Sequence, residues 1–154
     1  MSETATVVRV ETIVEVARAQ AFETFVDMAS WWPPSHHTGA EPWVAIVFER
    51  DVPGRWFERD AHGGENQWGR VLAFEPPARL LLDWQLNHEF AYDPSLHTDL
   101  EVVFHALDAN RTRVELVHHL HGYGVHAARM TEIFGAPDAW RGVLDAYAAV
   151  GSRA

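Results

Sequence analysis

Polar and apolar residues alternate along most of the chain with the period of two that is typical of β-strands. The alternating runs are separated by short turns rich in Gly, Pro, Asp and Asn, which are the residues that turn geometry favours. We therefore predict seven strands, over residues 7–16, 43–49, 55–59, 66–74, 80–86, 99–107 and 112–121.

The period changes to that of a helix in two places. Between residues 18 and 29, apolar side chains recur at helical spacing, and the sequence Trp31-Trp32-Pro33-Pro34 ends the pattern. Near the C-terminus, a short helical segment over 127–134 is interrupted at 135–138, and an apolar stripe at helical spacing follows over 140–148. These patterns predict one helix after the first strand and a C-terminal helical part in two pieces.

The order of strand, helix, six strands and helix predicts an α+β class. Consecutive strands joined by short turns form an antiparallel sheet, and one face of that sheet needs a cover, which the amphipathic C-terminal helix supplies. The 154 residues, 47% of them hydrophobic and without a low-complexity segment, are expected to form one domain over 1–154.

Charge and composition narrow the functional classes. Twelve basic against 22 acidic side chains give a formal net charge of −10, which disfavours nucleic acid and anionic membranes as partners. The chain has no cysteine, no signal-like N-terminus and no apolar stretch of membrane-spanning length. We expect a cytoplasmic protein without membrane insertion.

Three tryptophans, Trp56, Trp68 and Trp84, occupy three successive predicted strands. If the strands are neighbours, the indoles line one wall of the sheet, either as a heavy core or as the lining of a pocket. Strand parity points Trp56 and Trp84 toward the space under the C-terminal helix. The phase of Trp68 is open, because Gly69 beside it marks a candidate β-bulge.

Polar residues within apolar runs are the candidates for chemistry. Glu58 is in phase with Trp56 and His118 with Leu116, so both are expected to point inward, as proton-transferring groups or as satisfied structural residues. Asp83 is out of phase with Trp84 and is expected to face solvent.

No motif identifies a catalytic set, a cofactor site or a metal site. His119 and His121 are expected to share a strand face, but two imidazoles are too few for a tight zinc site. No serine lies on a nucleophile elbow, and no glycine-rich phosphate-binding loop follows a strand. We therefore predict no metal and no cofactor, and the catalytic residues, if any exist, stay unassigned.

Several segments, in this order along nearly the whole chain, resemble a known family. They are Ala21-Phe22-Glu23-Thr24-Phe25, Trp31-Trp32, Gly54-Arg55-Trp56-Phe57-Glu58, Trp68-Gly69-Arg70-Val71, Glu75-Pro76-Pro77 with Arg79-Leu80, Trp84-Gln85, Thr112-Arg113-Val114-Glu115-Leu116 with His118, and Trp140-Arg141-Gly142-Val143-Leu144. The set resembles the polyketide-cyclase-like helix-grip proteins of the START/SRPBCC superfamily, and more closely the branch related to the activator of the 90-kDa heat-shock protein ATPase.

The resemblance implies a curved antiparallel sheet of about seven strands wrapped around a long C-terminal helix, with a short helical segment after the first strand. It also implies a cavity between sheet and helix. Three functions then stay open: binding of a small hydrophobic or aromatic molecule, cyclase or aromatase catalysis by a cavity acid or base, and co-chaperone-like partner binding. The third conflicts with the single domain, because full-length activators have a separate N-terminal domain.

We expect binding of a small hydrophobic molecule as the primary function. Trp31 and Trp32 either gate the cavity or cap the core, and the loop over 88–97 is placed to be a lid. Exposed aromatic residues near 88–92 leave a homodimer open. The candidate ligand contacts are Trp32, Trp56, Glu58, Trp68, Trp84 and His118.

Overall fold

All seven predicted strands are present and form one antiparallel sheet. The computed structural model describes residues 6–152, and the strand order in the sheet is β1-β7-β6-β5-β4-β3-β2. Every strand except β1 therefore lies beside its neighbour in sequence, as short turns require. The strands are β1 (Val7–Val14), β2 (Trp43–Phe48), β3 (Gly54–Asp60), β4 (Glu65–Glu75), β5 (Arg79–Trp84), β6 (Asp99–Asp108) and β7 (Arg111–His119).

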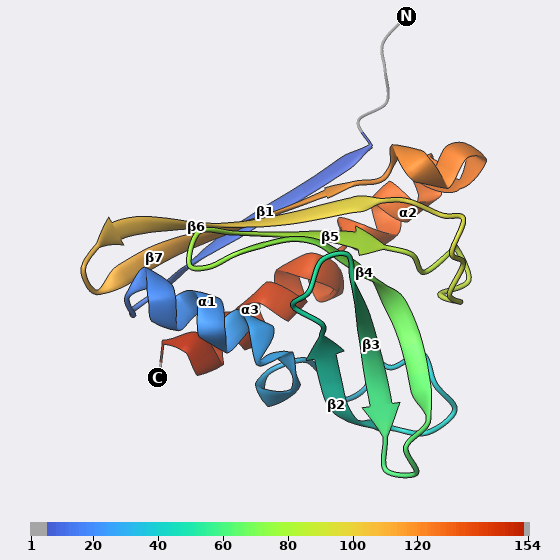
Figure 1. Cartoon of the computed structure of the whole chain (residues 1–154). Helices are drawn as coiled ribbons and strands as arrows, with labels where there is room; N and C mark the ends of the chain where they lie inside the picture. The colour runs from blue at the N-terminus through green and yellow to red at the C-terminus, as the bar shows by residue number, and fades with distance from the viewer. Residues whose placement is uncertain (1–5, 153–154) are drawn as a thin grey trace, which may run out of the picture.

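The helices lie on one side of the curved sheet, which bends away from β5 toward β2 (Figure 1). This arrangement is the predicted α+β helix-grip class. The C-terminal helical part is broken as predicted, with a π-helical turn before its last helix. The helical elements are α1 (Arg18–Val26), the 3₁₀ turns η1 (Met28–Ser30) and η2 (His121–His126), α2 (Ala127–Phe134), the π-helical turn η3 (Pro137–Arg141) and α3 (Gly142–Gly151).

Among the predicted ends that shift are those of the first helix and of two strands. The first helix stops at Val26, since Asp27 adopts φ −81° and ψ 55°, and 28–30 forms a separate turn. Strand β5 ends at Trp84, beyond which Leu86 makes only an isolated bridge with Tyr92. Strand β7 ends at His119, because Leu120 turns to φ −106° and ψ 3°. His121 therefore begins η2, and the prediction that it shares a strand face with His119 is wrong.

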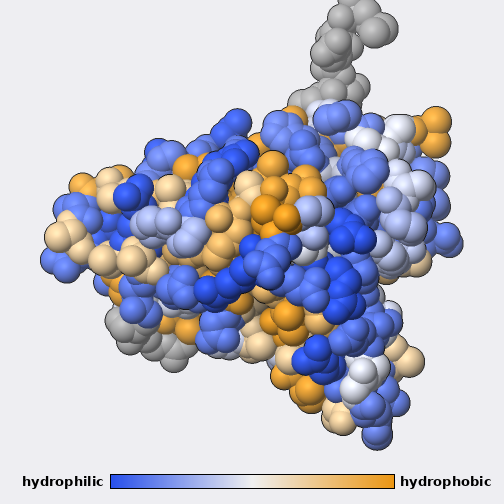
Figure 2. All heavy atoms as spheres, in the orientation of Figure 1, coloured by the Kyte–Doolittle hydropathy of each residue, from blue (hydrophilic) through white to orange (hydrophobic). Residues whose placement is uncertain are grey.

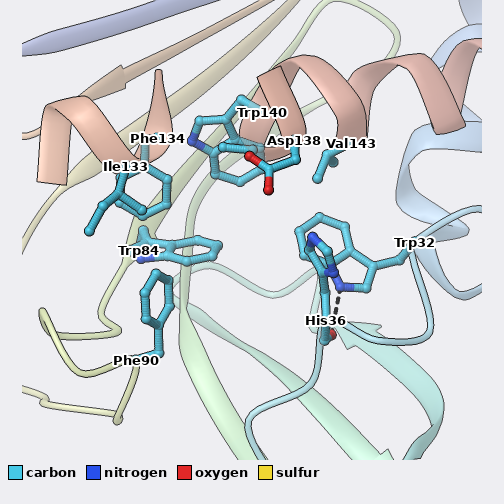
Figure 3. Close-up of a pocket in the computed structure, with 10 residues that line it drawn as sticks. Trp32, His36, Trp84, Phe90, Ile133, Phe134, Asp138, Trp140 and Val143 are labelled. Atoms are coloured by element: carbon cyan, nitrogen blue, oxygen red, sulfur yellow. Dashed lines mark hydrogen bonds between the residues drawn. The ribbon is translucent and has the colours of Figure 1, made fainter. Parts of the chain in front are cut away.

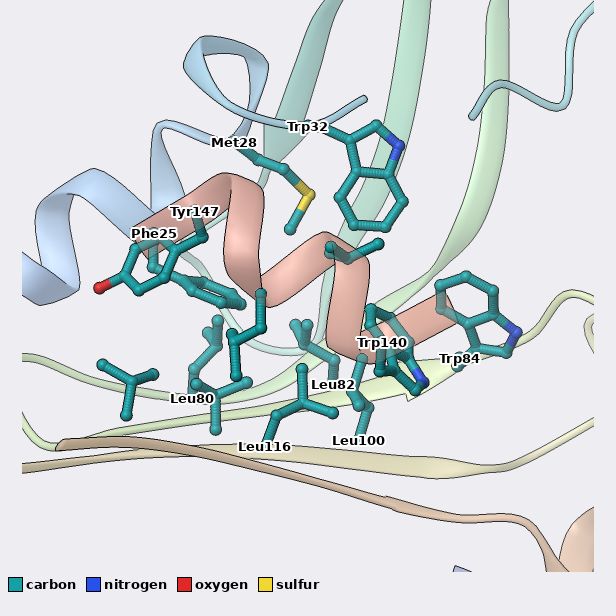
Figure 4. Close-up of a cluster of buried hydrophobic side chains, with 14 of the residues drawn as sticks. Phe25, Met28, Trp32, Leu80, Leu82, Trp84, Leu100, Leu116, Trp140 and Tyr147 are labelled. Atoms are coloured by element: carbon teal, nitrogen blue, oxygen red, sulfur yellow. The ribbon is translucent and has the colours of Figure 1, made fainter. Parts of the chain in front are cut away.

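The core fills the space between the inner face of the sheet and helices α1 and α3 (Figure 4). Leu80, Leu82 and Leu116 from the sheet are at most 1% exposed, and Tyr147 of α3 is fully buried. The Tyr147 hydroxyl donates to the carbonyl of Ala21 at 2.8 Å, which joins α3 to α1. Burial raises the pKa of this phenol, so it stays a neutral donor. The predicted role of the C-terminal helix as the cover is confirmed.

Polar residues cover much of the side of the molecule seen in Figure 2, with patches of hydrophobic residues between them. The outer face of the sheet is not uniformly exposed. Phe57 points outward from β3 and is only 1% exposed, because the guanidinium groups of Arg55 and Arg59 cover its ring at 4.4 and 5.3 Å. Both arginines also pair with Glu65. Cation–π contacts of this kind stabilise by about 0.5–1 kcal/mol where they are exposed.

A β-bulge sets the direction of Trp68. Trp56 pairs with Gly69 and Phe57 with Gln67, so Trp68 is the extra residue on β4. A Cβ atom on Gly69 would lie 1.7 Å from the carbonyl oxygen of Asp83, so only glycine fits there. The bulge turns the Trp68 indole into the interior, where it is 1% exposed.

Candidate functional site

A cavity of about 220 Å³ opens where the end of β5 meets the break in the C-terminal helical part (Figure 3). Its walls come from five segments: the loop after η1, the end of β5, the loop after β5, the end of α2, and η3 with the start of α3. It is lined by Trp32, His36, Trp84, Phe90, Ile133, Phe134, Asp138, Ala139, Trp140 and Val143.

A second cavity of about 130 Å³ adjoins the first. The two share the side chains of Trp32, His36, Trp84 and Phe90, which stand between them. The second cavity extends toward the sheet and the loop before β2. Its other lining residues are His37, Thr38, Trp68 and Leu86.

Trp84 is the centre of the aromatic wall. Its ring centroid lies 5.3 Å from Trp140, 5.6 Å from Phe134 and 5.7 Å from Trp56, in edge-to-face geometry. Such pairs contribute about 0.5–1.5 kcal/mol each beyond simple burial. The wall is therefore rigid, and it presents flat apolar surface to the cavity.

The candidate tryptophans divide into lining and supporting residues. Trp32 and Trp84 line both cavities, and Trp68 lines the smaller one. Trp56 lines neither, since it is fully buried behind them and stacks on Phe48 at 5.4 Å. Whether any of these residues contacts a ligand stays a prediction.

Trp31 and Trp32 have different roles. The Trp31 indole donates to the carbonyl of Thr24 at 2.9 Å and packs on Phe25 and Tyr147, so it caps the core. The Trp32 indole donates to the carbonyl of His36 at 2.8 Å. That bond holds the loop after η1 in the bend that brings His36 to the cavity.

Glu58 is a buried anchor behind the smaller cavity. One carboxylate oxygen, Oε1, accepts hydrogen bonds from the backbone N–H of Thr38 at 2.6 Å, the Thr38 hydroxyl at 2.9 Å and the Trp68 indole at 2.9 Å. The other oxygen, Oε2, is buried and has no hydrogen-bond partner within the described residues. Glu58 is in phase with Trp56 as predicted, but it lines neither cavity; it positions two residues that do.

His118 is the middle of a chain of hydrogen bonds between buried side chains. Its Nδ1 accepts from the Trp140 indole at 3.1 Å, which leaves the proton on Nε2 to be donated to the Thr98 hydroxyl at 3.0 Å. The Thr98 hydroxyl donates in turn to the carbonyl of Trp84 at 2.6 Å. Burial lowers the pKa of His118 to about 3, with a smaller contribution from the charge of His119. The imidazole is therefore neutral and fixes Trp140 against Trp84.

The prediction that Asp83 faces solvent is wrong. Asp83 does point to the outer face of the sheet, but residues 97 and 98 cover it there, and its side chain is only 5% exposed. Its carboxylate accepts from the backbone N–H of Thr98 at 3.0 Å and lies 2.6 Å from Nδ1 of His97. The hydrogen bond and the charge of Asp83 raise the pKa of His97. This cluster ties the end of the loop after β5 to the sheet.

Contacts at both ends and in the middle of the loop over 85–98 fix its position. The Gln85 amide donates to the carbonyls of Pro94 and Leu96, each at 3.1 Å. The rings of His88 and His126 stack at 3.7 Å. At the apex, Phe90 adopts φ +59°, an unfavourable backbone conformation for a bulky residue, and its ring lines both cavities. The loop predicted as a lid thus supplies one wall of the site.

Pattern analysis missed His36, Phe90, Phe134, Asp138 and Trp140 as cavity residues. Asp138 and His36 lie in irregular segments, where periodicity carries no information about direction. One signal for the cavity was present in the sequence. The segment from Gly135 to Asp138 breaks the C-terminal helical pattern, and a helix break beside an aromatic wall brings the backbone close to a cavity.

Within residues 6–152, no three His, Asp or Glu side chains gather as a metal site requires. No helix of that part is long and apolar enough to span a bilayer.

No protein-family model matches the chain, and no curated protein is significantly similar to it in sequence. Comparison with solved structures does find relatives. An anthrahydroquino-gamma-pyrone synthase, Txn09, is 33% identical over 94% of this chain and 96% of its own, with a TM-score of 0.64. CalC, a self-sacrificing resistance protein from Micromonospora echinospora, is 26% identical over 96% and 94%, with a TM-score of 0.72.

A protein from Nitrosomonas europaea shares the fold alone, with 11% identity and a TM-score of 0.68 over 99% of both chains. The predicted link to the heat-shock ATPase activator branch stays a prediction. The seven-stranded sheet is curled, and the C-terminal helices lie over it. One solved relative is one-third identical along nearly the whole chain. The chain therefore belongs to the START/SRPBCC superfamily of helix-grip proteins, with polyketide-cyclase-like relatives.

Proposed function

We propose that this protein binds a small, flat aromatic molecule in the cavity between the sheet and the break in the C-terminal helical part. The observation that carries the proposal is the lining of the larger cavity, in which five of the ten residues are Trp or Phe. Aromatic faces on opposite sides of a slot favour a planar guest, because both of its faces are then covered by ring surface.

The size of the site fits a compact ligand. Ligand sites commonly enclose roughly 300–1,000 Å³, and the larger cavity of about 220 Å³ lies below that range on its own. The adjoining cavity of about 130 Å³ shares the side chains of Phe90 and His36 with it, and both residues are exposed, so a rotamer change of either would join the two spaces. A molecule of two to four fused rings suits this space better than a long lipid chain.

The relatives support the same ligand class. The 33% identical synthase is named for an anthrahydroquino-gamma-pyrone, which is a planar multi-ring aromatic. We therefore take anthraquinone as the first probe of the cavity.

Filling the cavity is expected to abolish binding without unfolding the protein. Ala139 lines the larger cavity and is only partly buried, so Ala139→Phe adds a ring to the slot while the core stays intact. At a ligand concentration about a hundredfold above Kd, wild-type protein should gain roughly 5–10 °C in Tm, and Ala139→Phe should gain none. Thermal denaturation with and without anthraquinone measures both.

The matched control is Ala109→Phe, which adds the same ring to the exposed turn between β6 and β7. It should keep the wild-type ligand shift. Equal shifts in wild type and Ala139→Phe would place the ligand elsewhere and contradict the proposal.

Catalysis of a cyclase or synthase type is the second candidate, and the name of the same 33% identical relative is the observation that favours it. Proton transfer in such a reaction needs an ionisable group that reaches the bound molecule. Glu58 and His118 are held by other side chains behind the wall, and burial keeps His118 neutral. Their conservative variants, Glu58→Gln and His118→Gln, should therefore affect folding more than turnover.

Phe90 is expected to control ligand release. Phe90→Gly should speed dissociation, because the ring that closes the outer wall is gone. The free energy of unfolding should hold or rise by about 1 kcal/mol, since glycine adopts φ +59° without strain. Stopped-flow dissociation of anthraquinone and urea denaturation measure the two effects.

Phe90→Ala separates the effect of the ring on release from the effect of the backbone on stability, because it removes the ring and keeps a non-glycine residue at the strained φ. It should release ligand as fast as Phe90→Gly but be less stable than Phe90→Gly. Dissociation at the wild-type rate in both variants would show that Phe90 is not a lid.

A further inference from the structure

The larger cavity has one polar side chain on each of two facing walls. Eight of its ten lining residues are apolar, and the remaining two are His36 and Asp138. They come from segments far apart in sequence: His36 from the loop after η1, and Asp138 from the first turn of η3. Figure 3 shows the Asp138 carboxylate pointing into the space between Trp84 and Trp32, with His36 beside Trp32 across the gap.

Two of the three indole N–H groups around the larger cavity already have partners. The Trp32 indole donates to the carbonyl of His36, and the Trp140 indole donates to His118. Neither N–H is free for a ligand. The Trp84 indole N–H has no partner within the described residues, but it is buried, and in Figure 3 it lies on the side of the ring away from Trp32. The polar side chains left to meet a ligand in the larger cavity are therefore His36 and Asp138.

Both side chains can still form a hydrogen bond with a ligand. The hydroxyl of Ser35 lies 3.1 Å from Nδ1 of His36; when it donates there, Nε2 carries the ring proton and can donate to an oxygen of the ligand. Within residues 6–152, the Asp138 carboxylate has no hydrogen-bond or ion-pair partner, so it can accept from a hydroxyl. One donor and one acceptor thus face each other across an otherwise apolar slot.

We propose that His36 and Asp138 form the polar recognition pair of the cavity, which selects hydroxylated aromatic rings over unsubstituted ones. A phenolic hydroxyl is both donor and acceptor, and it can engage the carboxylate and the imidazole while the ring lies against Trp84 and Trp32. The inference rests on the proposed function, because it assigns the ligand class of the same cavity.

The test compares anthraquinone with 2-hydroxyanthraquinone, measured by quenching of tryptophan fluorescence. Wild-type protein should bind the hydroxylated compound about tenfold more tightly, the ratio that one charge-assisted hydrogen bond supplies. Asp138→Ala and His36→Ala should each lose most of that preference, and the double variant all of it. The preference is the ratio of the two dissociation constants within each variant, so a change in the affinity for anthraquinone itself does not enter it.

The controls are Asp145→Ala on the exposed side of α3 and His62→Ala in the turn between β3 and β4. They remove the same kinds of side chain outside the cavity and should keep the preference. Equal affinity of wild type for the two compounds, or a preference that survives in the double variant, would overturn the recognition pair and leave the proposed function standing. Failure of both compounds to bind would overturn the proposed function and this inference together.

Discussion

Glu58→Ala should lower the free energy of unfolding by about 2–4 kcal/mol, since it leaves three donors without their acceptor. The donors are the backbone N–H and hydroxyl of Thr38 and the indole N–H of Trp68, all within 2.9 Å of the same carboxylate oxygen. The loop before β2 loses its attachment to β3 in the same step. Urea denaturation followed by tryptophan fluorescence should show the midpoint fall by about 1–2 M.

Glu58→Gln is the matched control. Its amide oxygen can accept the same three hydrogen bonds, while its NH₂ group occupies the buried position where Oε2 now has no partner. The loss should therefore be smaller than in Glu58→Ala. If the two variants are equally destabilised, the hydrogen bonds to Oε1 are not what Glu58 contributes.

Acid should destabilise the protein through His118, by roughly 1 kcal/mol for each pH unit below 6.5. Burial lowers the native pKa of His118 to about 3, whereas in the unfolded chain the imidazole titrates near its ordinary value of about 6.5. Between these values the unfolded state binds one more proton than the native state, so lowering the pH favours unfolding. The free energy of unfolding, measured by urea denaturation at pH 7, 6, 5.5 and 5, tests the slope.

The His118→Gln variant isolates this contribution from the carboxylates and the other histidines. It should be less stable than wild type at pH 7, because its side chain cannot reproduce both bonds, to Trp140 and to Thr98. Its stability should decline less steeply between pH 6.5 and 5. His62→Gln, in an exposed turn, should keep the wild-type slope. A slope unchanged in His118→Gln would show that His118 is not the acid-sensitive group.

His97 contributes a weak pH dependence of the opposite sign, at higher pH. Its native pKa is raised by the hydrogen bond and charge of Asp83, so its contribution to stability is present below about pH 6.5 and is lost as the pH rises through the native pKa. The His97 side chain is 69% exposed, and solvent screens the pair. The two slopes therefore have opposite signs and lie in different pH ranges: that of His118 below about pH 6.5 and that of His97 above it.

The sheet and its inner face were predictable because alternation in a strand reports direction. It placed Glu58 and His118 inward, and Gly69 indicated the bulge that turns Trp68 into the interior. For Asp83, alternation gave the correct face but not the burial. Whether an outward residue meets water depends on what covers the face, and residues 97 and 98 are brought there by the path of a loop.

The lining of the cavity was harder to predict from alternation. Its position beside the end of β5 follows from where Trp84 lies, but His36, Phe90 and Asp138 come from loops and a helical break. Their directions depend on tertiary contacts such as the bond from Trp32 to the carbonyl of His36 and the positive φ of Phe90. Local sequence patterns do not encode such contacts.

The break between α2 and α3 separates two tasks that one continuous helix would combine. Val143, Leu144 and Tyr147 of α3 are buried and carry the fold, whereas Asp138 and Ala139 at the break face the cavity and contribute little to the core. Substitutions at the break can therefore alter what the cavity accepts at small cost to folding. A lineage that keeps α3 and varies 138–139 could acquire new ligands by single mutations while the fold is preserved.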